Sequence, residues 1–314
     1  MSDLRIVSFL PSATEMVCAL GLIDRLVGVT HECDYPAEVT CKPLVVRSTF
    51  DVAGMSPCEI DAAVSACISS HASLYQVDER LLQELAPTLI LTQDLCQVCA
   101  PSGNEITQLL KSLRSDPRIL RFTPKSLADI NENLRELGSA TDRCKEAQQV
   151  IASGEARLEQ VRALTRGARN RPRVFCMEWV DPIYCSGHWI PEMVELAGGV
   201  DELSRKGTDS ARVSWQEVIN WAPEVLVINP CGFDLANASH QALQLKGRDG
   251  LADLPAVLSN RVFGVDANSY FARPGPRVID GVELLAHLIH PQLCKWSGPN
   301  RAFQRIDLAN LGFY

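Results

Sequence analysis

The chain has 314 residues, of which 46% are hydrophobic and 22% are charged. This composition excludes a disordered or fibrous chain, and the length suits two domains better than one small module. Thirty basic residues against 38 acidic ones give a net charge of −8, so we expect neither a nucleic acid nor an anionic membrane surface as a partner.

The sequence shows no sign of membrane insertion. No stretch approaches the roughly 20 apolar residues that a membrane-spanning helix needs. The first residues, Met1 to Arg5, lack the basic region followed by an apolar run that is typical of a secretory signal. We therefore expect a cytoplasmic protein.

Strands and helices alternate through the first part of the chain. An apolar strand is predicted over residues 5–10, and the spacing of Ser12 and Glu15 predicts a capping box at the start of a helix that stops at Gly21. The other predicted strands cover residues 26–30, 44–47, 88–92 and 119–122, and the other helices cover residues 59–69, 78–85 and 106–113. This alternation predicts a parallel sheet covered by helices, in an N-terminal lobe over residues 1–122.

A long helix is predicted in the middle of the chain. Residues 142–166 contain no proline, and their apolar residues recur at helical spacing. About 25 residues would span roughly 37 Å, long enough to connect two lobes. We interpret residues 123–170 as a rigid helical linker, the alternative being an ordinary covering helix.

The alternation restarts after the linker. Strands are predicted over residues 174–179, 225–228 and 262–265, and helices over residues 191–197, 215–221, 235–245 and 276–289. They define a C-terminal lobe over residues 171–290, followed by an aromatic tail, residues 291–314, that is expected to pack back. The predicted fold class is α/β, with two Rossmann-like lobes that have parallel sheets and are joined by a single long α-helix.

Candidate ligand-binding residues follow the ends of the predicted strands. In a parallel sheet, ligands bind beyond the carboxyl ends of the strands. Aromatic, imidazole and amide side chains are found there, and the candidates are Tyr35, Gln93, Trp179, Tyr184, His188, Trp189, Tyr270 and Arg273. Aromatic walls and a guanidinium fork suit a large, flat ligand with a polar rim, although packing of the aromatic residues inside the protein is the alternative.

Four further residues suggest a metal site. Cys96 and Cys99 form a C-x-x-C pair after one strand, and His31 and Cys33 follow another. Together they could form a tetrahedral zinc or iron site, or a thiolate or imidazole could coordinate the metal of a bound ligand. The alternative is that the thiols are buried and free, as small hydrophobic side chains.

Several motifs, taken in order, resemble a known family. They are Arg5 to Glu15, Asp34-Tyr35-Pro36, Tyr184 to Gly187 before a helix that ends in Gly198-Gly199, and Tyr270 to Arg273 leading to Pro276-Arg277. Over residues 5–290 the chain resembles the helical-linker class (class III) of periplasmic-type substrate-binding proteins, and most closely its vitamin B12-binding members. The resemblance implies that cobalamin or a related corrinoid is held as ligand in the cleft between two lobes. It also implies that Tyr35, Tyr184, Tyr270 and Arg273 contact that ligand.

The chain departs from this family pattern at two positions that are shared by members associated with an importer. Those relatives present one glutamate per lobe to dock on the permease of an ATP-binding cassette (ABC) importer, whereas Arg80 and Gln216 occupy these positions here. Glu79 and Glu217 are adjacent, but one residue turns a helical side chain by about 100°. Docking to an ABC permease is therefore doubtful, and we expect a binding protein that works without an importer.

An enzyme is the alternative function. Cys96 and Cys99, helped by Glu178, Asp181 or His188, could act in thiol or redox chemistry on a tetrapyrrole or a small metabolite. However, the sequence has no nucleophile elbow, phosphate loop or dinucleotide fingerprint. A binding protein without catalysis is the favoured interpretation.

Overall fold

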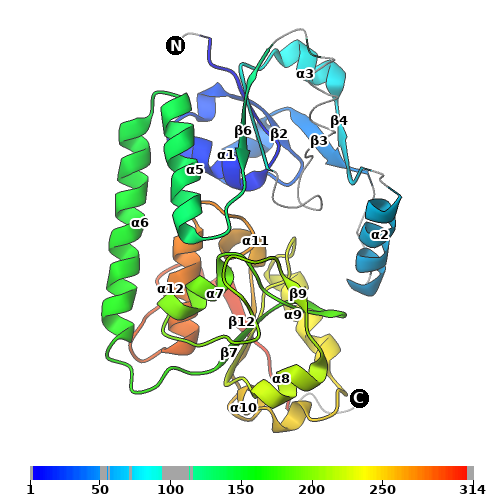
Figure 1. The fold of residues 1–314 in the computed structure, drawn as a ribbon, viewed down its shortest axis with the longest axis vertical. Helices are drawn as coiled ribbons and strands as arrows, with labels where there is room; N and C mark the ends of the chain where they lie inside the picture. The colour runs from blue at the N-terminus through cyan, green and yellow to red at the C-terminus, as the bar shows by residue number, and fades with distance from the viewer. Residues whose placement is uncertain are drawn as a thin grey trace. The chain divides into compact units, whose positions relative to one another are not determined.

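The computed structural model describes residues 3–49, 55, 57–70, 73–93, 113 and 116–309. The chain divides into two compact units (Figure 1). The N-terminal unit comprises Met1–Pro124 and Ala128–Ala152, and the C-terminal unit comprises Lys125–Leu127 and Ser153–Tyr314. Helix α6 (Cys144–Thr165) therefore contributes residues to both units.

The N-terminal unit is built on a six-stranded sheet in the order β4-β3-β2-β1-β5-β6. Its strands are β1 (Ile6–Ser8), β2 (Leu26–Thr30), β3 (Leu44–Ser48), β4 (Tyr75–Val77), β5 (Leu89–Gln93) and β6 (Arg118–Phe122). The central strands β1 and β5 are fully buried, as expected for parallel strands covered on both faces. Among the strands that the structure describes in this unit, only β4, at one edge, pairs antiparallel.

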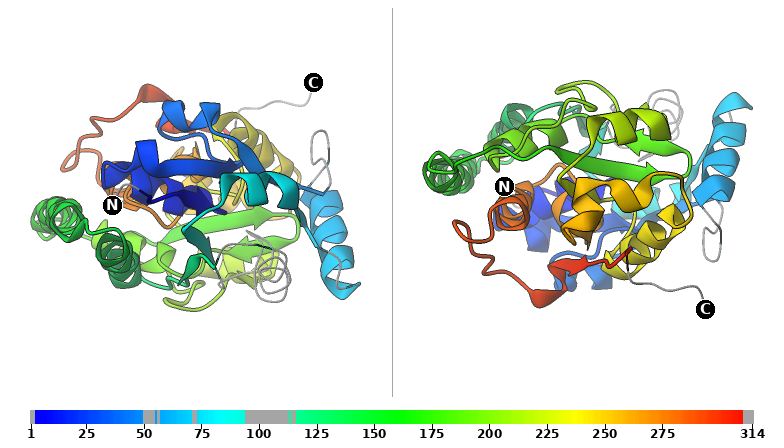
Figure 2. Two further views of the ribbon diagram at one scale, coloured as in Figure 1. Left: turned by 90° about the horizontal axis from the view of Figure 1, so that it is seen from above. Right: turned by 90° about the horizontal axis from the view of Figure 1, so that it is seen from below.

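Helices and short 3₁₀ turns lie between and after these strands. They are α1 (Pro11–Ala19), α2 (Pro57–Ser69), α3 (Glu79–Leu85), α5 (Leu127–Ala140), and the 3₁₀ turns at Ile23–Arg25 and Ala37–Cys41. Helix α5 runs beside the first part of α6, where Gly138 lies so close to Ala147 that a side chain would not fit (Figure 2). The helix predicted over residues 106–113 lies, apart from Leu113, outside the described residues.

The C-terminal unit has its own six-stranded sheet, in the order β12-β11-β10-β7-β8-β9. Its strands are β7 (Val174–Val180), β8 (Ile183–Cys185), β9 (Ala211–Arg212), β10 (Val225–Ile228), β11 (Val262–Val265) and β12 (Phe303–Arg305). Strands β7, β10 and β11 are parallel, whereas β8, β9 and β12 pair antiparallel. Strand β12 comes from the tail after Pro291 and pairs with β11.

Helices cover both faces of this sheet. They are α7 (Ile190–Leu196), α8 (Trp215–Trp221), α9 (Leu235–Ala242), α10 (Pro255–Leu258), α11 (Ala267–Tyr270) and α12 (Val278–Ile289), with 3₁₀ turns at Leu243–Leu245, Leu251–Asp253 and Asn300–Ala302. On one face, Phe175 and Met177 join a buried apolar cluster that includes Val218 of α8. On the other, Gly199 fits closely among Val174, Val194 and Ile289, where a larger residue would clash.

The predicted α/β class, with two lobes and one long helix, is confirmed. Both sheets are mixed rather than purely parallel, because short edge strands add to the parallel core. The 22 residues of α6 give a helix about 33 Å long. Among the described residues, none of the helices is both long and apolar enough to cross a membrane.

The capping box predicted at Ser12 is wrong. Helix α1 begins at Pro11, so Leu10 is the N-cap residue and makes no side-chain capping bond. Proline is common at the first position of a helix, because the backbone N–H that it lacks would have no helical partner there. Ser12 consequently lies inside the first turn, where it is buried.

Candidate functional site

Two aromatic rings meet at the carboxyl edge of the C-terminal sheet. Trp179 lies near the end of β7, and Phe233 lies in the loop after the neighbouring strand β10. Their ring centroids are 5.4 Å apart, with the planes tilted by 54°. The carbonyl oxygen of Phe233 accepts a hydrogen bond from the backbone N–H of Asn268, at the start of α11, at 3.2 Å. The segments at the ends of the neighbouring strands β7, β10 and β11 are thus in contact around this aromatic pair.

Tyr184 and Arg212 form a second pair in this sheet. They face each other across the antiparallel strands β8 and β9. Arg212 Nε donates a hydrogen bond to Tyr184 Oη at 2.8 Å, and the guanidinium carbon lies 5.4 Å from the centre of the tyrosine ring. The arginine is therefore held by both a hydrogen bond and a cation–π contact.

His188 and Trp189 are tightly bound into the fold. His188 has a φ of +53°, and its backbone N–H donates to the carbonyl oxygen of Thr208 at 2.6 Å. Its Nε2 lies 3.2 Å from Asp209 Oδ1. Burial lowers the pKa of His188, while Asp209 opposes that shift. Trp189 is buried, and its Nε1 donates to the carbonyl oxygen of Phe271 at 2.8 Å.

Tyr270 and Arg273 lie at and just after the end of α11. Tyr270 is 8% exposed, and its ring meets Trp296 of the tail edge-on, with 5.7 Å between centroids. Burial raises the pKa of its phenol. Arg273 is half-buried. Tyr270 thus supports the tail in this structure, while Arg273 retains contact with solvent.

The N-terminal unit carries the remaining ligand candidates at the carboxyl edge of its own sheet. Tyr35 follows β2 and is 48% exposed, which is high for a large aromatic residue. Gln93 ends β5 and is buried. These two residues differ in what they can offer a ligand, because the side chain of Tyr35 is exposed to solvent and that of Gln93 is buried.

The structure describes half of the predicted metal site. Cys96 and Cys99 lie outside the described residues. Cys33 is buried, with Sγ 3.1 Å from Thr14 Oγ1, and His31 Nδ1 lies 3.3 Å from the carbonyl oxygen of Val46. Within the described part of the chain, no group of three or more histidine, cysteine or acidic residues could hold a metal ion.

The carboxylates of the alternative enzyme have local partners. Glu178 Oε2 accepts a hydrogen bond from Ser210 Oγ at 2.7 Å. Asp181 Oδ1 lies 3.7 Å from a guanidinium nitrogen of Arg248. Both interactions hold loops around β7.

Sequence reasoning missed Phe233 and Arg212 as site residues. Phe233 belongs to the segment that follows β10, so its position after a strand was the available signal. Arg212 gave no such signal, because β9 has two residues and is defined only by its pairing with β8.

Comparisons with known proteins identify the family. The family model described as "Periplasmic binding protein" matches residues 6–269, and the chain belongs to this family. The ABC transporter substrate-binding lipoprotein YvrC of Bacillus subtilis is 27% identical over 299 residues, which cover 93% of this chain and 81% of that protein. The vitamin B12-binding protein of Vibrio cholerae is 27% identical over 282 residues, covering 89% and 86%.

Solved structures share the fold. The periplasmic vitamin B12-binding protein BtuF of Vibrio cholerae matches with a TM-score of 0.64 at 23% identity, covering 91% of this chain and 96% of that one. The periplasmic heme-binding protein RhuT of Roseiflexus matches with a TM-score of 0.68 at 21% identity, covering 92% and 98%. The resemblance to helical-linker binding proteins is therefore confirmed.

Two consequences follow for function. The chain is a periplasmic-type solute-binding protein, and its family is one of binding proteins rather than enzymes. The predicted cytoplasmic location is wrong, because the relatives are a lipoprotein and periplasmic binding proteins. That prediction rested on the first few residues of the sequence, whereas the relationship extends over most of the chain.

Proposed function

We propose that this protein binds cobalamin or a related corrinoid. Relatives named vitamin B12-binding proteins match about nine-tenths of the chain. A corrinoid has broad apolar faces and a rim of amide groups, so its binding site needs aromatic surfaces together with fixed polar donors.

The aromatic edge of the C-terminal sheet carries this proposal. Trp179 and Phe233 provide two ring surfaces, and the Tyr184–Arg212 pair adds a third ring with a guanidinium beside it. Trp179 Nε1 is buried and has no hydrogen-bond partner among the described residues. An indole N–H without a partner is costly to bury, and an amide oxygen of the ligand would be a suitable acceptor for it.

We assign different roles to the predicted site residues. Trp179, Tyr184 and Arg273 are the proposed ligand contacts of the C-terminal unit. Tyr35 and Gln93 are those of the N-terminal unit. His188, Trp189 and Tyr270 have partners inside the fold, so we propose that they hold the binding surface in place.

We infer that the charges used for permease docking differ from those of glutamate-bearing relatives. Arg80 is highly exposed and pairs with Glu84, and Gln216 bonds to Asn220. The carboxylate of Glu217 accepts hydrogen bonds from Ser214 at the start of α8. Permease residues that complement a glutamate would therefore meet a cation or an amide on this chain.

Titration with cyanocobalamin tests the proposed function, with hemin as the competing ligand. All five tryptophans lie in the C-terminal unit, so their fluorescence reports on binding there. We expect saturable, one-to-one quenching by cyanocobalamin, and at least about tenfold weaker binding in Trp179→Leu. Trp215→Leu is the matched control, because Trp215 is the first residue of α8, packs against the buried apolar cluster and donates a hydrogen bond to the carbonyl oxygen of Asp249.

Two results would count against the proposal. Retention of hemin but not of cyanocobalamin through gel filtration would make heme the ligand. Equal affinities in Trp179→Leu and Trp215→Leu would remove the aromatic edge from the site.

A further inference from the structure

Arginines are concentrated where α6 ends and the chain leads into β7. Between residues 160 and 173 there are five arginines and no acidic residue: Arg162, Arg166, Arg169, Arg171 and Arg173. The whole chain has a net charge of −8, so the charge of this segment is opposite in sign to that of the whole chain. Such a local excess of guanidinium groups is the charge pattern of an anion-binding surface.

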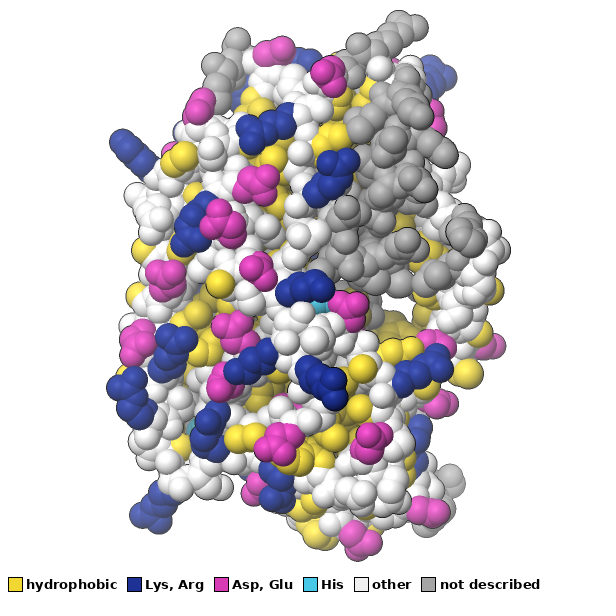
Figure 3. Space-filling view, in the orientation of Figure 1, with side chains coloured by type: hydrophobic (Ala, Val, Ile, Leu, Met, Phe, Trp, Pro, Cys, Tyr) yellow, Lys and Arg dark blue, Asp and Glu magenta, His cyan; other side chains and the backbone are white. Residues whose placement is uncertain are grey.

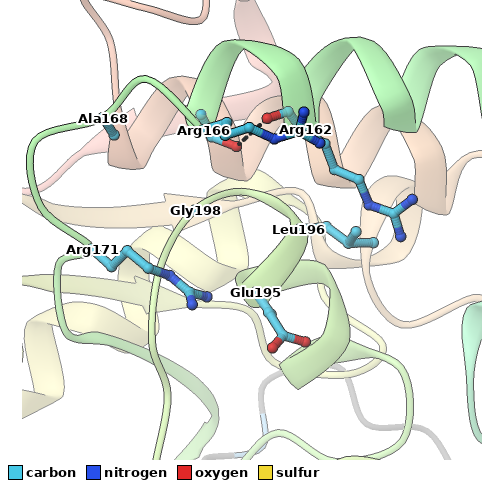
Figure 4. Close-up of a pocket in the computed structure, with 8 residues that line it drawn as sticks. Arg162, Arg166, Ala168, Arg171, Glu195, Leu196 and Gly198 are labelled. Carbon is cyan, nitrogen blue, oxygen red and sulfur yellow. Dashed lines mark hydrogen bonds between the residues drawn. The ribbon is translucent and has the colours of Figure 1, made fainter.

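A cavity of about 440 Å³ opens beside this segment, within the C-terminal unit (Figure 4). It lies between the last turn of α6, the loop before β7 and the end of α7. Its lining residues are Arg162, Thr165, Arg166, Ala168, Arg171, Glu195, Leu196 and Gly198. The volume falls in the range of small-molecule sites and exceeds what a single ion requires.

Two of the lining arginines are held only loosely. Guanidinium nitrogens of Arg162 and Arg166 lie 3.6 and 3.7 Å from the carboxylate of Glu159, and neither side chain makes a hydrogen bond with the described residues. The side chains are 51% and 76% exposed, so these ion pairs contribute little to stability. Their N–H groups are available to a ligand.

The third arginine is held in place. Arg171 donates from Nη2 to the carbonyl oxygen of Gly199 at 2.8 Å, and its side chain extends toward Glu195 (Figure 4). The pKa of Glu195 is lowered mainly by a hydrogen bond from Lys206, and further by the charges of Arg171 and Arg162. Arg171 and Arg162 therefore both act electrostatically on Glu195, which lines the cavity.

Positive charge remains after the acidic neighbours are considered. Arg162, Arg166, Arg171 and Lys206 face two carboxylates, those of Glu159 and Glu195. Helices α6 and α7 both end here, and the partial negative charge of helix C-termini also attracts cations. If these cations served only to stabilise the helix C-termini, the cavity would have no affinity for a soluble anion.

We propose that this cavity is a second ligand site, which binds a phosphate-type oxyanion carried by a small molecule such as a phosphate ester or a diphosphate. Guanidinium forks match the oxygens of phosphate groups. Glu195 lies where a hydroxyl or ammonium group of the same ligand would be accepted. The cavity adjoins the loop that leads into the amino end of β7, whereas the aromatic pair lies at the carboxyl edge of the same sheet, so the two sites act separately.

Calorimetric titration with inorganic pyrophosphate at low ionic strength tests the proposal. We expect saturable, one-to-one binding that weakens at least about tenfold in the double variant Arg166→Gln/Arg171→Gln. The variant Arg25→Gln/Arg118→Gln carries the same change of charge on exposed residues of the N-terminal unit, and it should bind pyrophosphate like the wild type. Cyanocobalamin binding should be the same in all three proteins.

Co-sedimentation with vesicles of phosphatidylglycerol and phosphatidylcholine distinguishes the sources of phosphate. Sedimentation that pyrophosphate abolishes would assign the cavity to a lipid headgroup. Pyrophosphate binding without sedimentation would assign it to a soluble phosphate ester. Three results would overturn the proposal: no saturable binding of pyrophosphate, equal affinity in the two double variants, or vesicle binding that pyrophosphate does not compete for.

Discussion

Asp201 is a mostly buried carboxylate that organises the loop before β9. Its Oδ1 accepts hydrogen bonds from the backbone N–H groups of Leu203 and Ser204 at 3.1 and 3.2 Å, and its Oδ2 accepts one from Ser204 Oγ at 2.7 Å. Burial nevertheless raises its pKa from 3.8 to about 6, because the lost hydration of the charge outweighs these bonds. The folded chain therefore holds this proton more tightly than the unfolded chain does.

This shift predicts how stability depends on pH. A carboxyl group whose pKa is raised by folding contributes stability below its unfolded pKa, and that contribution is lost as the pH rises through about 6. We expect Asp201→Asn to remove this loss. Relative to the wild type, its free energy of unfolding should improve by at most about 3 kcal/mol between pH 4 and pH 8.

Urea denaturation followed by tryptophan fluorescence at several pH values measures this change. The exposed Asp253 provides the control, since Asp253→Asn should follow the wild type at every pH. If the difference between Asp201→Asn and the wild type does not vary with pH, Asp201 does not titrate in this range.

Single residues also show where sequence reasoning succeeds and fails. The pattern at Ser12 predicts a capping box, yet Pro11 takes the first helical position and moves Ser12 inside the helix. A real capping box forms between Ser214 and Glu217 at α8. Both segments have serine three residues before glutamate. They differ in the residue before the serine, which is Pro11 in the first segment and Val213 in the second.

At the scale of elements, α6 is fastened to α12 by Arg157. This side chain donates from Nε to Glu283 Oε1 at 2.8 Å and from Nη2 to Glu283 Oε2 at 2.6 Å, and it also bonds to Asp280. These hydrogen bonds, led by that of Glu283, raise the pKa of the guanidinium further above its usual value. Close by, Gly154 of α6 packs against Ile279 of α12.

Removing this arginine should destabilise the C-terminal unit. Arg157→Met keeps most of the aliphatic stem but leaves Asp280 and Glu283 beside each other without a cation. We expect the free energy of unfolding to fall by about 1 to 2 kcal/mol, a value reduced for the partial exposure of all three groups. Urea denaturation followed by tryptophan fluorescence reports it directly, because all five tryptophans lie in this unit.

The control is an exposed arginine in the same unit. Arg162 of α6 pairs with Glu159 one turn away, and such a surface pair contributes less than about 0.5 kcal/mol. Similar losses in Arg157→Met and Arg162→Met would show that the connection between α6 and α12 is no stronger than a surface ion pair.

Elements with a clear apolar pattern were predictable because that pattern is local. The sequence predicts β10, β11 and α8 with the bounds that the structure has. The short strands β8, β9 and β12 were missed, since two or three residues carry no periodicity and their pairing depends on distant neighbours. Helix α5 was also missed within the segment interpreted as linker.

At the scale of the whole molecule, candidate ligand residues could be chosen from the sequence, whereas the contacts that they make could not. The rule that ligands bind at the carboxyl ends of parallel strands directed attention to Trp179 and Tyr184. Their pairing with Phe233 and Arg212 emerges only from the folded sheet. The residues interpreted as a possible metal site include Cys96 and Cys99, which lie outside the described residues.

Net charge is a poor guide to individual sites in this protein. On the face shown in Figure 3, basic and acidic side chains are interspersed. The net charge of −8 argues against broad classes of partner, yet it conceals the arginine-lined cavity at the end of α6. Composition describes the whole surface, whereas a binding site depends on a few neighbouring groups.

The central claim is that aromatic residues at the carboxyl edges of the sheets bind a corrinoid. A crystal structure of the complex with cyanocobalamin, with data collected at the cobalt absorption edge, tests it most directly. We predict one anomalous peak per chain, with the corrin ring within contact distance of Trp179 and Tyr184. A cobalt peak at the amino ends of the strands, or none in crystals soaked to saturation, would contradict the claim.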